Sequence, residues 1–353
     1  MKRIKVFFSL FFVLIICYLL IISVKDNERT NTIEPNSVRS IYEESHYPVE
    51  IENLNSKNEE NILIYKKPPQ RVIAFWQNSI ETLIALGVGD RIIVGTGIPD
   101  KKYLRAEYQD VYTKIPYTSL QNLDIETITM LEPDFILGWY STFTPKVAGT
   151  TSYWNSRAVN TYIAKSSAPI RNNNTDILIK SKHSLEEEYQ YILDLGKIFD
   201  REEKANELVK QMQNEINYVV ESTKNVNQKT TAIIIEFTGK DISVYGENTL
   251  AGDILQRVNG RLLEANAERF SFEQLIDLDP EAIFIVVTER DYGNEQNYLD
   301  RIYQNKALQG LKCVKNKRVY TLPLYAIYSP GIRAYDGIKI IAKGLYPELY
   351  REK

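Results

Sequence analysis

The chain has 353 residues, with 43 Lys and Arg against 46 Asp and Glu, and a formal net charge of −3. This balance gives no electrostatic basis for binding nucleic acid, and the length suits two domains of ordinary size. With two cysteines (Cys17, Cys313) and two histidines (His46, His183), the composition excludes a disulfide framework and a histidine-rich metal site.

The first 24 residues are predicted to be an export signal or membrane anchor. Three positive charges precede an apolar run at residues 6–24, which at ~1.5 Å per residue can just cross a bilayer of ~30 Å as a helix. Positive charge before such a run sends the rest of the chain across the membrane. We expect an uncleaved anchor. Lipid attachment at Cys17 is the alternative, although Ile16 stands where a small residue is expected. Both place the body outside the cytoplasmic membrane.

Residues 25–45 are polar, rich in Asn, Glu and Ser, and without apolar periodicity, which is typical of a flexible, solvated tether. An N-terminal lobe is predicted over residues 46–183. It begins with a hairpin that pairs residues 49–51 with residues 62–65 around a polar stretch.

A buried type of strand is predicted at residues 69–76, where the apolar run ends in a large aromatic residue. A helix at 79–86 follows at once, and residues 91–95 supply a second strand. Strand, helix and strand in this order imply a parallel sheet with right-handed crossovers.

One sequence pattern occurs twice without a gap, at residues 124–136 and 271–283. In each copy a capping side chain precedes a short helix with apolar periodicity, a proline stops the helix, and an apolar strand follows. Glu126 and Glu273 fall in the first helical turn, where the helix dipole favours a carboxylate. Capping explains each glutamate separately, but it gives no reason for the whole unit to recur. The repeat therefore indicates two similar lobes.

Linking helices are predicted over residues 184–228. The first covers 185–199, and the second covers 202 to about 223, with Asp200 as its cap. A helix of that length spans ~30 Å, the width of a small domain, and would form a stiff connection. A C-terminal lobe is predicted over residues 229–353.

Four features in this order resemble the iron-siderophore class of ABC-transporter substrate-binding proteins, and the likeness covers residues 46–350. They are the segment at 69–97, the two repeated units, the long linking helix, and Ser329-Pro330-Gly331-Ile332-Arg333 leading into Leu345-Tyr346-Pro347. The resemblance implies an α/β fold of two Rossmann-like lobes joined by a single long α-helix, as in class III periplasmic binding proteins. It also implies a ligand in the cleft between the lobes and small lobe motions on binding.

The same resemblance implies a partner. In the family, one glutamate per lobe docks on arginines of a dimeric ABC permease, and Glu126 and Glu273 are the residues at the matching positions. Two equivalent carboxylates suit a partner that is itself two-fold symmetric. We expect a monomeric receptor with no cofactor of its own, which captures a ferric siderophore and delivers it to the permease.

Ligands of open α/β sheets lie beyond the carboxyl ends of the strands. This rule predicts ligand contacts from aromatic residues at strand ends, and the segment 153–157 adds further candidates in a region without a strong helix or strand signal. Large aromatics are also common in the core, which is the alternative for each of them. The predicted aromatic contacts are Trp76, Trp139, Tyr140, Trp154, Tyr245, Tyr325 and Tyr328.

Anionic ferric chelates would need cations to offset their charge, and guanidinium groups can pair with carboxylates or stack on aromatic planes. Arg157, Arg269 and Arg333 are the candidates, and a solvated surface position is the alternative for each. Arg333 is the preferred one, because the family often contributes to the cleft from the segment that enters the last helix.

Several other functions remain open at this stage. A haem or cobalamin receptor would have the same fold, and an anchored ligand sensor would have the same sequence features. A chelatase-like enzyme would need an acid-base or metal-binding residue in the cleft, and neither histidine is near a predicted strand end. We therefore expect a binding protein and not an enzyme.

Overall fold

The computed structural model describes residues 46–171, 178–179, 182–263 and 270–350. The predicted anchor and tether at residues 1–45 lie outside the described residues. Within the described part, no helix is both long enough and apolar enough to cross a membrane. Residues 47–353 form one unit, which contains two five-stranded sheets.

The sheet of the first lobe is parallel throughout, with the order β5-β4-β3-β6-β7. All four residues of the central strand β3 are buried, as expected when helices cover both faces of a parallel sheet. The predicted antiparallel hairpin is present as β1 and β2. The strands are β1 (Val49–Leu54), β2 (Glu60–Tyr65), β3 (Val72–Phe75), β4 (Ile92–Thr96), β5 (Tyr117–Ser119), β6 (Phe135–Gly138) and β7 (Asn160–Ile163).

The sheet of the second lobe has the order β11-β10-β13-β14, and the short β12 pairs with the start of β10. Only the edge strand β11 is antiparallel. Every residue of β13 is buried, which again fits a sheet covered on both faces. The strands are β10 (Thr231–Thr238), β11 (Asp241–Val244), β12 (Arg261–Leu262), β13 (Ala282–Val287) and β14 (Val319–Pro323).

The repeated sequence unit has the same structure in both lobes. Helix α5 (Ile125–Met130) starts after Asp124, whose carboxylate accepts a hydrogen bond from the Thr127 N–H at 2.8 Å, and β6 follows it. Helix α10 (Phe272–Leu278) starts after Ser271, which forms a capping box with Gln274, and β13 follows it. The helix, proline and strand predicted from the repeat are confirmed in each lobe.

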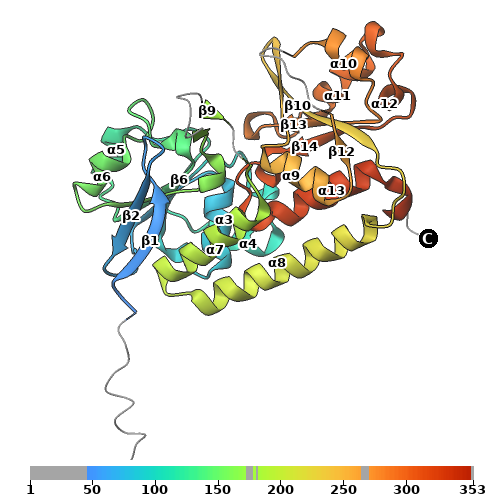
Figure 1. Cartoon of the computed structure of the whole chain (residues 1–353). Helices are drawn as coiled ribbons and strands as arrows, with labels where there is room; N and C mark the ends of the chain where they lie inside the picture. The colour runs from blue at the N-terminus through green and yellow to red at the C-terminus, as the bar shows by residue number, and fades with distance from the viewer. Residues whose placement is uncertain (1–45, 172–177, 180–181, 264–269, 351–353) are drawn as a thin grey trace, which may run out of the picture. The chain divides into compact units, whose positions relative to one another are not determined.

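The long linking helix is α8 (Glu202–Thr223), and it follows α7 (Leu185–Phe199). Figure 1 shows α8 running along both lobes. The prediction that Asp200 caps α8 was wrong, because Asp200 adopts a left-handed conformation (φ 56°) that ends α7, and Arg201 is the N-cap of α8. The Arg201 N–H turns back to donate to the Gly196 carbonyl at 2.7 Å, which fixes this tight connection.

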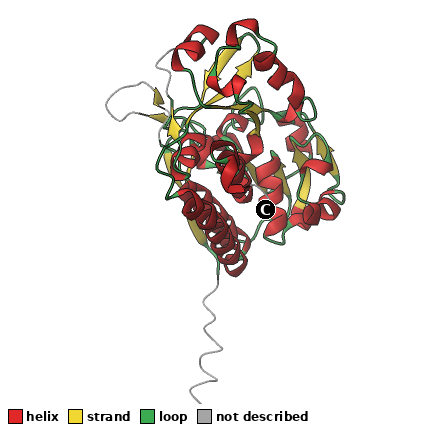
Figure 2. Ribbon diagram, turned by 90° about the vertical axis from the view of Figure 1, so that its right-hand side faces the viewer, coloured by secondary structure: helices red, strands yellow, loops and turns green. Residues whose placement is uncertain are grey.

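The remaining helices pack around the strands (Figure 2). A small antiparallel pair, β8 (Ile170–Arg171) and β9 (Leu178–Ile179), precedes α7. The fold class is confirmed as two α/β lobes with a long connecting helix, while the predicted borders at 183 and 228 stay predictions. The helices are α3 (Gln77–Ala85), α4 (Ala106–Tyr112), α6 (Thr151–Asn155), α9 (Leu250–Arg257), α11 (Glu295–Tyr303), α12 (Lys312–Lys315) and α13 (Ala334–Leu345).

Candidate functional site

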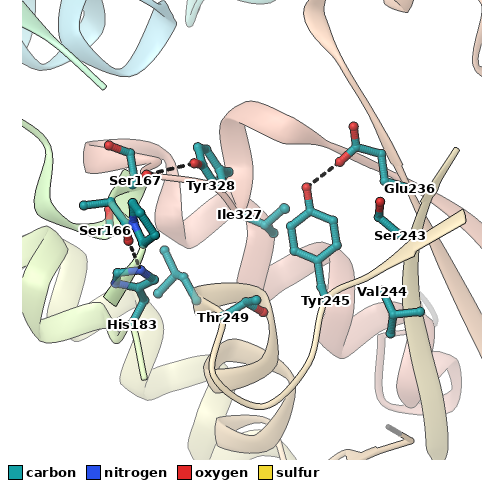
Figure 3. Close-up of a pocket in the computed structure, with 13 residues that line it drawn as sticks. Ser166, Ser167, His183, Glu236, Ser243, Val244, Tyr245, Thr249, Ile327 and Tyr328 are labelled. Carbon is teal, nitrogen blue, oxygen red and sulfur yellow. Dashed lines mark hydrogen bonds between the residues drawn. The ribbon is translucent and has the colours of Figure 1, made fainter. Parts of the chain in front are cut away.

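A cavity of about 260 Å³ lies where the two lobes meet. The first lobe contributes the segment after β7, and the second contributes residues at or near β10, β11, α9 and β14 (Figure 3). The cavity thus lies at the carboxyl ends of several parallel strands, where α/β sheets place their ligands. Its walls are formed by Ser166, Ser167, Ala168, Pro169, His183, Glu236, Ser243, Val244, Tyr245, Thr249, Leu250, Ile327 and Tyr328.

Tyr245, a predicted ligand contact, lines this cavity. Its hydroxyl donates to Oε2 of Glu236 at 2.6 Å (Figure 3). Burial, and next the negative charge of Glu236, raise the pKa of Tyr245 well above its usual value. The phenol is therefore a neutral hydrogen-bond donor at physiological pH, and it holds the carboxylate at the cavity wall.

Tyr328, a second predicted contact, also lines the cavity and joins the lobes. Its hydroxyl donates across to the Ser167 carbonyl at 3.0 Å. Burial, with a smaller contribution from Glu236, raises the pKa of Tyr328 to about 12. This neutral donor closes one side of the cavity.

The predicted tryptophans Trp76 and Trp139 stand next to Tyr328. Their rings stack at a centroid distance of 4.4 Å and an interplanar angle of 13°. Trp139 then meets the Tyr328 ring edge-on at 5.0 Å and 78°. The three rings form one aromatic row that starts at the end of β3, passes the end of β6 and reaches the second lobe.

The lobes make further close contacts beside the cavity. The hydroxyls of Ser166 and Ser329 share a hydrogen bond. The N–H of Gly331 donates to Oε2 of Glu188 on α7 at 2.7 Å. Gly331 has a φ of 54°, and a Cβ there would lie 2.7 Å from Oγ1 of Thr82, so only glycine fits this approach between the lobes.

His183 lines the cavity although it is not near a predicted strand end, so the sequence argument against an acid-base residue in the cleft was incomplete. Its Nδ1 is 2.8 Å from Oε2 of Glu187, and its Nε2 is 2.9 Å from the Ala168 carbonyl. The His183 backbone N–H donates to the Asn248 carbonyl of the second lobe at 3.1 Å. The backbone of His183 thus links the two lobes, while its side chain, with both ring nitrogens facing oxygen atoms, offers no free nitrogen to a metal.

Arg333 and Tyr325 lie in a different contact between the lobes and do not line the cavity. The buried Arg333 guanidinium pairs with Glu81 on α3 and with Asp336, and it lies 4.3 Å from the Tyr325 ring centroid. Burial alone would lower the pKa of Arg333, but the carboxylates of Glu81 and Asp336 raise it. The charge of Arg333 is thus already neutralised by the protein.

Trp154 and Arg157 were predicted at an irregular loop, but they belong to a short capped helix and its end. Thr150 caps α6, and Trp154 is buried in the core of the first lobe, with Nε1 donating to the Ala148 carbonyl at 2.6 Å. Arg157 is exposed and lies over the Tyr153 ring at 3.7 Å. In Figure 1, α6 lies on the side of the first lobe away from the second.

Tyr140 is a further candidate that does not line the cavity. Tyr140 follows β6, but its hydroxyl donates to the Ser56 carbonyl in the turn between β1 and β2 at 3.3 Å. Arg269 lies outside the described residues. The lining residues that strand-end reasoning missed belong mainly to short or edge elements, above all Ser166 to Pro169 after β7 and Ser243 and Val244 on β11. For Ser166 and Ser167 the available sequence signal was the short strand Asn160–Ile163 that precedes them.

Glu126 and Glu273, the predicted docking residues, are both exposed in the first turn of α5 and α10. Hydrogen bonds to its own backbone N–H and to Ser271 lower the pKa of Glu273. Figure 1 shows both helices on the side away from α8. The geometry therefore leaves both carboxylates open to solvent and to a partner.

Comparison with known proteins adds four findings. The family described as periplasmic binding protein matches residues 72–326. The crystal structure of a periplasmic binding protein from Veillonella parvula DSM 2008 has 40% sequence identity and a TM-score of 0.76, and the match covers 87% of this chain and 94% of that one. An uncharacterised ABC transporter substrate-binding lipoprotein of Bacillus subtilis (strain 168) is 23% identical over 87% of this chain and 88% of its own. The petrobactin-binding protein of the same organism is 23% identical over 75% and 78%.

Proposed function

The chain belongs to the periplasmic binding protein family, and we propose that it is the substrate-binding component of an ABC importer that captures a ferric siderophore between its lobes. The observation that carries the proposal is the cavity between the lobes, with Tyr245 and Tyr328 in its wall. The names of the two Bacillus subtilis relatives support the transporter role and the siderophore, respectively.

Ligand entry requires the lobes to separate. The cavity holds about 260 Å³, whereas sites for small organic ligands usually span ~300–1,000 Å³. The contacts that must break or adjust include the Tyr328 hydroxyl on the Ser167 carbonyl and the hydroxyl pair of Ser166 and Ser329. They also include the His183 N–H on the Asn248 carbonyl and the ion pair of Arg333 with Glu81. A stiff α8 permits a small rotation of each lobe while the chain stays connected.

The proposed partner is a dimeric ABC permease. Glu126 and Glu273 present one exposed carboxylate from each lobe, and each follows the same capping geometry. Charge-assisted pairs with arginines of the permease would orient the receptor over the translocation path. The position of the chain would be the outer face of the cytoplasmic membrane, held by residues 6–24 or by lipid on Cys17, and the lipoprotein among its relatives supports this placement.

The test is a binding titration. The full chain, purified in mild detergent, is titrated with ferric siderophores, haem and cobalamin while tryptophan emission is recorded. We expect saturable quenching by a ferric siderophore at micromolar concentration or below, because the tryptophan row ends at a residue of the cavity wall. Saturation by haem or cobalamin alone would assign the chain to one of those ligands, and no saturation by any of the three classes would overturn the proposed function.

A further inference from the structure

The charges around the cavity have one sign. Among the 13 lining residues there is one carboxylate, Glu236, and there is no Lys or Arg. The arginine that the sequence offered for an anionic ligand, Arg333, is buried against Glu81 and Asp336 instead. The described wall therefore has an anion and neutral phenols but no Lys or Arg to receive an anionic chelate, and both ring nitrogens of its imidazole, His183, already face oxygen atoms of the protein.

A second carboxyl group stands behind this wall. Glu289, which follows the carboxyl end of β13, is only 5% exposed, and its buried Oε1 has no hydrogen-bond partner among the described residues. Burial, and to a lesser degree the charge of Glu236, raise the pKa of Glu289 to about 7. The nearby cation that acts on it, Arg290, is exposed. Burying a carboxyl oxygen without a hydrogen-bond partner is costly unless something else compensates it.

Tyr245 is bonded to one of the two acids and lies within the electrostatic influence of the other. Its hydroxyl is bonded to Glu236, and the charges of both Glu236 and Glu289 act on it. A ligand in the cavity contacts this pair directly, because Tyr245 and Glu236 both belong to the wall (Figure 3). In a site with low dielectric, like charges placed close together repel strongly and an ammonium group is attracted.

We propose that the wall formed by Glu236 and Tyr245, backed by Glu289, receives a cationic group of the ligand. The chain then selects ferric chelates that carry a protonated amine and rejects strongly anionic ones. This inference rests on the proposed function and names the class of chelate. It reverses the expectation from the sequence that the cleft would supply arginines to an anionic ligand.

The experiment compares chelates that differ in charge. The full chain is titrated with a ferric tris-hydroxamate bearing a free terminal amine, with the same chelate after acetylation of that amine, and with an anionic ferric tris-catecholate. Acetylation removes the charge and leaves the iron coordination unchanged. We expect the amine to strengthen binding about tenfold or more, as for a charge-assisted hydrogen bond, and the catecholate to bind weakest.

A variant tests whether Glu236 causes the preference for the amine. Glu236→Gln should abolish most of the difference between the amine and its acetylated form. Glu203→Gln, an exposed acid on α8, serves as the control and should preserve it. Thermal unfolding shows whether the Glu236→Gln chain is folded. If it is not, the comparison of chelates on the unaltered chain still tests the charge preference.

The possible results distinguish failure of the charge preference from failure of the proposed function. Equal or tighter binding of the acetylated chelate, or tightest binding of the catecholate, would overturn the charge preference and leave the proposed function standing. A preference for the amine that survives in Glu236→Gln would overturn the assignment of this wall. If no chelate gives a saturable signal, the proposed function fails and the charge preference fails with it.

Discussion

Glu81 and Arg333 form a buried ion pair that joins the two lobes. Nη1 of Arg333, in the second lobe, lies 2.9 Å from Oε1 and 3.0 Å from Oε2 of Glu81 on α3, and the two side chains are 8% and 0% exposed. The Arg105 backbone N–H also donates to Glu81, at 2.9 Å. The pair lies outside the cavity, so its effect is on the assembly of the lobes.

Removing the cation should therefore destabilise the chain. Arg333→Met leaves Glu81 buried without its counter-charge, and loss of one partner from a buried pair costs about 3–5 kcal/mol. We expect a loss near the lower value, since Gln77 and the Arg105 N–H still donate to Glu81. The measurement is urea denaturation followed by circular dichroism.

Two variants control this prediction. Arg157→Met replaces an exposed arginine and should change the free energy of unfolding by less than about 0.5 kcal/mol. Adding Glu81→Gln to Arg333→Met should recover part of the lost stability, because no buried charge then remains unpaired. An Arg333→Met chain as stable as Arg157→Met would show that the ion pair contributes nothing.

Glu188 predicts a dependence of stability on pH. Burial raises its pKa from 4.5 to about 7, while hydrogen bonds from Ser166 and the Gly331 N–H work in the opposite direction. Because the folded pKa lies above the unfolded one, this stability is fully present below about pH 4.5 and is lost as the pH rises through about 7. Glu188→Gln keeps an acceptor for Gly331 and has no proton to lose.

We therefore expect Glu188→Gln to be more stable than the unaltered chain at pH 8, by up to about 3 kcal/mol, and to differ little at pH 4.5. Thermal unfolding at both pH values measures this difference. Glu203→Gln should change stability by less than about 0.5 kcal/mol at either pH. If the stability difference between Glu188→Gln and the unaltered chain is the same at pH 4.5 and pH 8, Glu188 does not cause the pH dependence.

The parts of the fold that were predicted correctly from the sequence are those with local sequence signals. The side chains of Asp124 and Ser271 each accept a hydrogen bond from the backbone N–H three residues later. The prolines and apolar strands then follow at fixed offsets in the sequence. Tyr245 and Tyr328 were proposed as ligand contacts from the ends of predicted strands, and both line the cavity. These features depend on neighbours along the chain, which a single sequence displays.

The remainder depends on partners far away in the chain. The ion pair of Arg333 with Glu81 could not be foreseen, because the two residues are 252 positions apart in the sequence. Trp154 was proposed as a ligand contact because Thr150 was not recognised as the N-cap of α6. The burial of the Trp154 indole was not foreseen either. His183 was dismissed because it follows no predicted strand, yet it lines the cavity where the two lobes meet.

Ligand binding should be reported by Trp139 and not by Trp154. Trp139 contacts Tyr328 in the cavity wall, so a ligand that moves Tyr328 changes the environment of the stacked pair Trp76 and Trp139. Trp154 is buried in the core of the first lobe, with its N–H already bonded to a backbone carbonyl. We expect Trp139→Phe to lose most of the quenching and Trp154→Phe to retain it. Quenching that disappears only in Trp154→Phe would place the ligand elsewhere.

The docking role predicts that binding and uptake can be separated. Glu126→Ala combined with Glu273→Ala removes two fully exposed carboxylates that lie outside the cavity wall, so affinity for the ligand should stay within about twofold of the unaltered chain. Uptake of the labelled chelate should fall to background, since the receptor can no longer orient itself on the permease. Each single variant should keep part of the uptake, because one anchored lobe still guides the complex.

The matched control is Glu203→Ala combined with Glu207→Ala, which removes two exposed acids from α8 and the same net charge. This chain should take up ligand normally, because α8 faces away from α5 and α10 (Figure 1). If the control loses uptake as well, the effect comes from overall charge and not from a docking site. If the double variant at 126 and 273 transports normally, the repeated glutamates serve only as helix-capping residues, and the permease must recognise another surface.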